Sequence, residues 1–173
     1  MGYSVRYQIL PLDKEMFDNQ DIETLQQEFF EDDLIESADE YGCSYLAFEI
    51  QELPLHEDEV VYLLFQYDSK IVASGLLIDV DAFDEPDEDG FTGVYVFISS
   101  AIATFEPVEL AEFQTIFPET KSFSDEPQEF DGTKLDAFVK LVRPRLRNLE
   151  PEEFTPEEWI REQLEAMAEE VEE

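Results

Sequence analysis

Acidic side chains are concentrated in residues 79–90, DVDAFDEPDEDG, where seven carboxylates fall within twelve residues and no lysine or arginine interrupts them. Calcium prefers carboxylate oxygens, and an EF-hand loop places its ligands at positions 1, 3, 5 and 12, with glycine at position 6. Counted from Asp79, position 5 is Phe83 and position 12 is Gly90, and neither supplies a side-chain ligand. The spacing therefore predicts no tight calcium site.

Three interpretations of this acidic segment remain open: a solvated connection between strands, a weak divalent-cation site, and a negative surface that binds a partner. A second dense acidic group falls on one face of an expected helix near the N-terminus. If the acids serve recognition, we expect these two clusters to carry it. Their members are Glu28, Glu31, Asp32 and Asp33 on the helix, and Asp79, Asp81, Asp84, Glu85, Asp87, Glu88 and Asp89 in the loop.

Residues suited to nucleophilic or metal-assisted catalysis are scarce. His56 is the single histidine and Cys43 the single cysteine, so a histidine-based metal cluster and an intrachain disulfide are both ruled out. The sequence has no G-x-S-x-G elbow and no glycine-rich phosphate-binding motif. Pairs of carboxylates could do glycosidase chemistry, but with 45 acids such pairs arise everywhere by chance. We predict a non-enzymatic protein that uses no cofactor and no metal.

Half of the ten basic residues lie in one fourteen-residue stretch, at Lys134, Lys140, Arg143, Arg145 and Arg147. The last four are candidates for contact with an anion such as a phosphate or an acidic partner. The alternative is that these bases pair with carboxylates of the same chain. The excess of acids favours this second interpretation, so we expect Arg143 or Arg145 to be bound to a carboxylate within the chain.

The elements that must position these side chains can be read from the hydrophobic pattern. Period-two or continuous apolar runs predict strands at 3–10, 44–51, 60–67, 71–78 and 93–98. The third and fourth runs are joined by the turn Asp68-Ser69-Lys70, which indicates a hairpin. Because both of these runs are almost entirely apolar, we expect the hairpin to be covered on both faces. The acidic segment then links 71–78 to 93–98 and projects from the end of the sheet.

Capping residues and helical spacing predict four helices. Their ranges are 21–37 after the cap Asp21, 107–117 opened by Pro107, 133–143 capped by Thr133, and 156–170 opened by Thr155 and Pro156. No linker or repeat divides the chain. The prediction is one α+β domain spanning 1–173, with a mostly antiparallel curved sheet, flanking helices and a helical C-terminal part at 133–173.

Residues 59–131 resemble the PUA-like β-barrel superfamily, which includes the PUA, ASCH and EVE domains. The resemblance is carried by the hairpin VVYLLFQYDSKIVASGLLI and by GVYVFISSAIATFEPVELAEFQTIFPETKSFSDEPQEFD. It implies a small, strongly curved sheet or barrel and, in many relatives, binding of RNA or a modified base through basic and aromatic surfaces. This chain departs from that pattern because no base lies between Ile71 and Thr120. A ligand pocket lined by Tyr62, Tyr67 or Tyr95 would favour that function.

The charge balance is the strongest compositional feature, with 45 acids against 10 bases and a formal net charge of −35. A folded chain of this length has a diameter of roughly 40 Å. A DNA duplex of that length carries about 24 phosphates, so the two have a similar charge per length to an order of magnitude. Such a surface attracts a groove built to bind nucleic acid.

The sequence therefore favours an acidic binding protein that engages a basic, nucleic-acid-binding protein. The most specific version of this hypothesis is a nucleic-acid mimic or inhibitor, which binds no nucleic acid itself. Two rivals remain. One is a PUA-like module that binds a small ligand or modified base, and the other is a halophile protein whose charge serves only solubility. With one cysteine, no apolar run long enough to cross a membrane and no signal peptide at the N-terminus, we expect a cytoplasmic protein.

Overall fold

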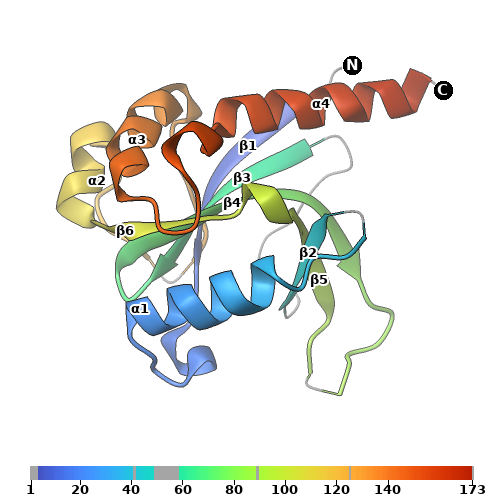
Figure 1. The fold of residues 1–173 in the computed structure, drawn as a ribbon. Helices are drawn as coiled ribbons and strands as arrows, with labels where there is room; N and C mark the ends of the chain where they lie inside the picture. Colours follow the sequence, from blue (N-terminus) through green and yellow to red (C-terminus); the bar gives the residue numbers. More distant parts are fainter. Residues whose placement is uncertain (1–3, 41, 49–58, 89, 125, 173) are drawn as a thin grey trace.

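A seven-stranded mixed sheet forms the centre of the computed structural model, which describes residues 4–40, 42–48, 59–88, 90–124 and 126–172 (Figure 1). The strands run in the spatial order β2-β5-β4-β3-β1-β7, and β6 pairs with β4 outside this path. They are β1 (Ser4–Pro11), β2 (Cys43–Phe48), β3 (Glu59–Tyr67), β4 (Lys70–Ala82), β5 (Gly93–Ile98), β6 (Ala103–Glu109) and β7 (Gln128–Glu129). Only β1 and β3 pair in parallel, which confirms a mostly antiparallel sheet; the sheet is open rather than a closed barrel.

The hairpin of β3 and β4 is the middle of the sheet and is buried on both faces, as its apolar sequence predicted. Its turn is made by Asp68 and Ser69, which both have positive φ angles, as a tight two-residue hairpin turn requires. Along β3, alternate side chains enter different cores: Tyr62 and Leu64 face one, while Leu63 faces the other. The sheet is therefore a shared wall between two hydrophobic layers.

Helices cover the two faces of this wall (Figure 1). One face is covered by α1 (Ile22–Thr24) and its π-helical continuation η2 (Leu25–Ile35), which bury Leu25, Phe30 and Leu34. The other face is covered by α2 (Leu110–Ile116), α3 (Leu135–Val142) and α4 (Pro156–Glu172). Short 3-10 turns complete the chain: η1 (Lys14–Phe17), η3 (Ser99–Ala101), η4 (Gly132–Lys134), η5 (Arg143–Arg145) and η6 (Pro151–Glu153).

Asp21 caps the first helix as predicted, since its carboxylate accepts a hydrogen bond from the Thr24 amide at 2.7 Å. The cap before α3 was predicted wrongly. Asp131, not Thr133, accepts the amide hydrogen bond, and the single turn η4 precedes the α-helix. Asp131 accepts the amide of Thr133 itself within the turn, so the side-chain cap belongs to η4, and α3 begins after Lys134 without a side-chain cap.

The prediction that Pro107 opens a helix is also wrong, because Pro107 lies in β6 and α2 begins three residues later. A proline can occupy this strand because the ladder between β4 and β6 is irregular there. Val108 pairs with Ile71 and Thr104 with Ala73, so the residues between are out of register. The register shift is a tertiary feature that the local sequence does not show.

β4 continues four residues further than predicted and ends at Ala82. Asp79 and Asp81 therefore lie in a strand, paired with β5, and not in the loop to which they were assigned. The predicted strand 44–51 is confirmed as β2 up to Phe48, and its last three residues lie outside the described part. None of the helices within the described ranges has the length and apolarity needed to cross a bilayer.

Candidate functional site

The acidic cluster on the first helix is held in place by a buried glutamine. Gln26, on the inner side of η2, donates to the carbonyl oxygen of Val72 at 2.9 Å and to that of Phe105 at 2.6 Å. These carbonyls belong to β4 and β6 where their register shifts. Because the side chain of Gln26 satisfies two buried acceptors of the sheet, it fixes the rotation of η2 and hence the direction of its outer face.

Of the four predicted acids on this helix, three are exposed: Glu28, Asp32 and Asp33. Glu31 differs, since its carboxylate accepts hydrogen bonds from Arg147 at 2.9 Å and from the Thr104 hydroxyl at 2.8 Å. These contacts tie η2 to β6 and to the segment after η5. Glu31 therefore serves as an internal link, and the exposed acids of η2 are the ones available to a partner.

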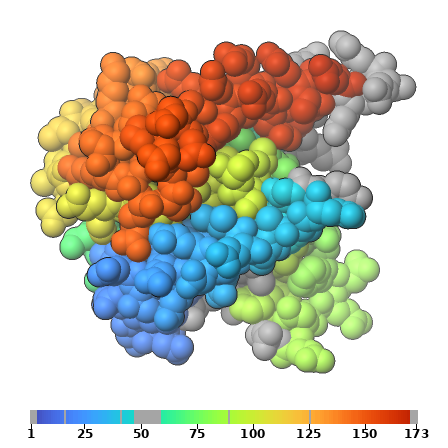
Figure 2. Space-filling model, viewed as in Figure 1, coloured from blue at the N-terminus to red at the C-terminus, as the bar shows by residue number. Residues whose placement is uncertain are grey.

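The second predicted cluster lies on the hairpin of β4 and β5, which projects at the lower right of the molecule (Figure 2). Its members Asp79, Asp81, Asp84, Glu85, Asp87 and Glu88 are exposed, and Asp89 lies outside the described residues. Asp87 organises the tip, because its carboxylate accepts from the Phe91 amide at 2.9 Å. Over the ranges that the structure describes, no group of three or more His, Cys, Asp or Glu residues is arranged to hold a metal ion.

The candidate anion contacts of the C-terminal part are largely occupied by carboxylates. Lys140 pairs with Asp136 at 3.1 Å, and Arg145 makes a two-pronged ion pair with Glu112. Arg147 pairs with Glu31 at 2.9 Å. The expectation that Arg143 or Arg145 is bound to a carboxylate of the chain is thus confirmed at Arg145, whose guanidinium lowers the pKa of Glu112.

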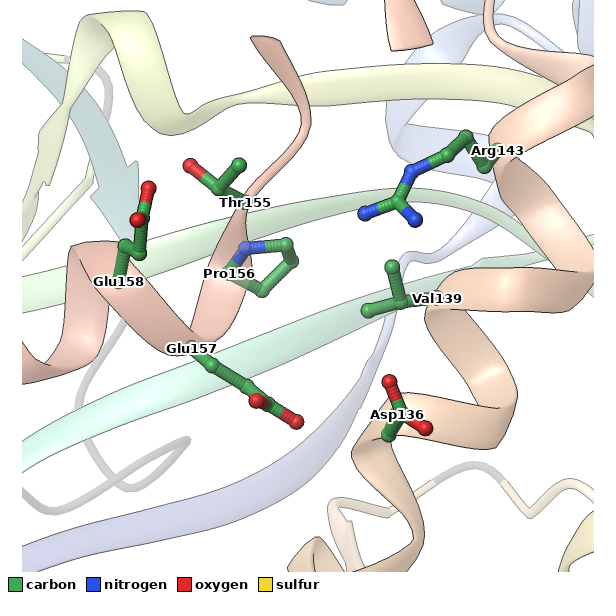
Figure 3. A pocket seen from close by; sticks show the side chains of 7 residues that line it. All are labelled: Asp136, Val139, Arg143, Thr155, Pro156, Glu157 and Glu158. Atoms are coloured by element: carbon green, nitrogen blue, oxygen red, sulfur yellow. The ribbon is translucent and has the colours of Figure 1, made fainter. Parts of the chain in front are cut away.

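Arg143 is the exception, and it lines a pocket of about 160 Å³ between α3 and the start of α4 (Figure 3). Its guanidinium points toward the start of α4 and donates to the carbonyl oxygen of Phe154 at 3.0 Å. Three carboxylates line the same pocket. No carboxylate of the described chain makes an ion pair with Arg143. The remaining lining residues are Asp136, Val139, Thr155, Pro156, Glu157 and Glu158. With three acids and one base, this pocket is negative on balance and suits an anion poorly.

The three tyrosines that would line a ligand pocket in the PUA-like alternative are core residues. Tyr62, Tyr67 and Tyr95 are fully buried, and they are divided between the two cores. The Tyr62 hydroxyl donates to Ser74 at 3.0 Å, and the Tyr67 hydroxyl donates to the carbonyl oxygen of Gln20 at 2.7 Å. A second pocket is lined by Lys70, Glu106, Pro107, Glu109, Glu112 and Arg145, and neither it nor the pocket beside Arg143 contains an aromatic side chain. These two pockets therefore give no support to the aromatic ligand site of the PUA-like alternative.

The thiol of Cys43 is not activated as a nucleophile. Burial and the nearby carboxylate of Asp39 raise the pKa of Cys43, which keeps the thiol protonated and weakly nucleophilic. His56 lies outside the described residues.

The sequence reasoning passed over two exposed aromatic residues, Tyr45 (46% exposed) on β2 and Phe83 (36%) at the end of β4. The Tyr45 hydroxyl donates to Asp39, and this hydrogen bond raises the pKa of Tyr45 to about 12. A signal was present, because Tyr45 and Leu46 are neighbours in a strand and point to opposite faces, and Leu46 packs against the core beneath η2.

Neither the protein-family models nor the curated proteins give a match to this chain. Among solved structures, the fold is similar to an ASCH protein of Zymomonas mobilis, with a TM-score of 0.43 and 9% identity over 79% of this chain and 96% of that one. It is also similar to the YTH domain of Mmi1 in complex with RNA, with a TM-score of 0.47 and 14% identity over 84% and 85% of the two chains.

Proposed function

We propose that this protein is a non-enzymatic binding protein whose acidic surface engages a basic, nucleic-acid-binding protein in place of its nucleic acid. The observation that carries the proposal is the pairing of the basic residues. All ten bases lie in the described part of the chain, and seven of them make ion pairs with carboxylates. The paired bases are Arg6, Lys14, Lys70, Lys134, Lys140, Arg145 and Arg147.

This pairing leaves the surplus of acids uncompensated across the surface. Each of the seven paired bases offsets one nearby carboxylate, and the surplus acids that give the net charge of −35 have no base to offset them. Surface charge of one sign steers an oppositely charged partner and raises its association rate. A partner with a groove for a phosphate backbone has the complementary field.

Two acidic surfaces are built on ordered elements and are therefore suited to a defined contact. The outer face of η2 is fixed by the packing of Phe30 and by the hydrogen bonds of Gln26. The hairpin of β4 and β5 is held by the strand ladder up to Ala82, paired with Gly93. Carboxylates on such elements lose little conformational freedom on binding, which lowers the entropic cost of association.

Direct RNA binding is the rival that the resemblance suggests, and the Mmi1 YTH domain was solved with RNA. In this chain the net negative field opposes a phosphate backbone, and three of the four bases that could contact phosphates, Lys140, Arg145 and Arg147, are held in internal ion pairs. The tyrosines that could stack on a base are buried. We therefore predict that the protein does not bind nucleic acid.

The test captures partners from a lysate with three forms of the protein at 50 mM salt. They are the wild type, the η2 variant Glu28→Gln/Asp32→Asn/Asp33→Asn, and the control variant Glu162→Gln/Glu165→Gln/Glu169→Gln on α4. Both variants lose three exposed carboxylates, so they have the same net charge. The proposal predicts a basic partner that the wild type and the control retain, that the η2 variant recovers poorly, and that duplex DNA displaces.

Two results would contradict the proposal. One is a partner that is neutral or acidic, or that DNA leaves in place. The other is direct binding of a labelled RNA or DNA duplex by the wild type, lost in Arg143→Glu, which would favour the nucleic-acid-binding rival.

A further inference from the structure

We propose that the outer edge of β2 binds an extended lysine- or arginine-rich segment of the partner, which joins the sheet as an additional strand. This inference rests on the proposed function and specifies where and in what conformation the partner binds. Among the strands that the structure describes, β2 is the terminal one, and its pairing partner there is β5. Terminal strands present unpaired backbone groups, and strand addition is a common mode of peptide recognition.

The hydrogen bonds of Cys43 show which backbone groups face outward. Its amide donates to the Asp39 carboxylate at 3.0 Å and its carbonyl accepts from the Asp39 amide at 2.9 Å, so both point away from β5. Backbone groups alternate along an antiparallel strand, and therefore those of Tyr45 also point away from β5. No group in the described part of the chain pairs with them.

The side chain of Tyr45 marks the face of the sheet that this edge borders. Tyr45 pairs with Val96, and Val96 pairs with Asp79, so the three lie in one row across β2, β5 and β4. Asp81, two residues further along β4, lies on the same side as Asp79, because Val80 between them packs at the margin of the core beneath η2. Tyr45 thus lies on a face that also carries carboxylates, and Phe83, the other exposed large hydrophobic residue of the described chain, follows directly after the end of β4.

This combination selects a basic occupant. A residue opposite Tyr45 in the added strand exchanges two backbone hydrogen bonds with it and places its side chain on the same face. A lysine or arginine at that position contacts the ring of Tyr45. It also reaches the carboxylate of Asp39, which accepts the hydrogen bond of the Tyr45 hydroxyl. A second copy of this chain is disfavoured as the occupant, because each copy carries a net charge of −35.

Three fluorescein-labelled peptides of equal charge test the inference by anisotropy at 50 mM salt. The first alternates lysine and threonine over eight residues, the second carries N-methyl groups on the lysine amides, and the third carries them on the threonine amides. A lysine opposite Tyr45 donates its own backbone amide to β2. We therefore expect the second peptide, whose lysine amides are methylated, to bind about tenfold more weakly than the first, because two hydrogen bonds to β2 are lost. The third should bind like the first.

Two variants test the same contact from the side of the protein. Tyr45→Pro removes an amide that faces away from β5, so it spares the ladder with β5 and should weaken the first peptide about tenfold. Tyr45→Thr keeps the amide, loses the ring, and should weaken binding less. Equal affinities for the three peptides would overturn the inference, whether or not Tyr45→Pro folds. The proposed function would still stand after that result if the η2 variant Glu28→Gln/Asp32→Asn/Asp33→Asn binds the partner more weakly than the wild type.

Discussion

At the scale of single residues, the acids and amides of this chain divide into those that hold the fold and those that face solvent. Glu31 and Glu112 bind arginines, whereas Glu28, Asp32 and Asp33 are exposed on η2. The sequence cannot separate these groups, because Glu31 and Asp32 are neighbours in one acidic run. What distinguishes Glu31 is the approach of Arg147, 116 residues away along the chain.

Gln26 provides the sharpest stability test at this scale. In Gln26→Leu, the carbonyls of Val72 and Phe105 lose their donor in a buried site. We expect urea denaturation to show a loss of about 2–4 kcal/mol, since each unsatisfied buried acceptor costs roughly 1–3 kcal/mol. The neighbouring exposed Gln27→Leu is the control and should change stability by less than about 0.5 kcal/mol. Similar losses in both variants would show that Gln26 does not anchor the helix.

The ion pair of Arg145 and Glu112 predicts a pH dependence. The guanidinium lowers the pKa of Glu112 in the folded protein, so the pair stabilises the fold above the unfolded pKa of glutamate, about 4.3. This stabilisation is lost as the pH falls through the lower, folded pKa. The difference in unfolding free energy between wild type and Glu112→Gln should therefore be full at pH 6 and shrink below pH 4. A difference that stays constant from pH 6 to pH 3 would contradict this assignment.

At the scale of elements, local patterns predicted most strands and helices because burial imposes a strict period on them. The strands β3, β4 and β5 and the capped first helix follow from apolar alternation and from Asp21. The errors occur where distant contacts decide the structure. β6 can contain Pro107 because the register of its pairing with β4 shifts there. Asp79 lies in β4, and not in the loop, because it pairs with β5.

The candidate site was predictable in part for the same reason. Exposure of acids on η2 follows from the helical stripe that buries Leu25 and Phe30. The internal ion pairs of the basic residues were expected from the excess of acids, but the identity of each partner depends on tertiary packing. The sequence left open whether the tyrosines line a pocket or the core, because a buried tyrosine and a pocket tyrosine have the same local sequence pattern, and only the packing of both sheet faces distinguishes them.

The inner seam of α4 packs against the core. Ile160 is buried against the sheet, and Leu164 and Met167 pack at the margin of the same cluster. We expect Ile160→Ala to cost about 2–4 kcal/mol and Met167→Ala roughly 1 kcal/mol in chemical denaturation. Glu165→Ala, on the exposed side, should cost almost nothing. If the loss of unfolding free energy in Ile160→Ala depends on protein concentration, the seam is instead a dimer interface.

At the scale of the whole molecule, a net charge of −35 must destabilise the folded state by self-repulsion. Salt screens this repulsion over a Debye length of about 10 Å at 0.1 M. We expect the midpoint of thermal unfolding at pH 7 to rise by roughly 5 °C between 0.02 and 0.5 M NaCl. Calorimetry that finds the protein unfolded until molar salt is added would favour the halophile interpretation, and a constant midpoint would show that self-repulsion is negligible.

The measurement that tests the central claim most directly is the association rate of the captured basic partner, followed by stopped-flow fluorescence from 50 to 200 mM salt. If the acids of η2 attract the partner, Glu28→Gln/Asp32→Asn/Asp33→Asn should slow association about tenfold at 50 mM salt, and the difference should narrow as salt rises. The α4 control, with the same net charge, should associate as the wild type does. Equal rates for the two variants, or rates that do not depend on salt, would contradict recognition by this acidic surface.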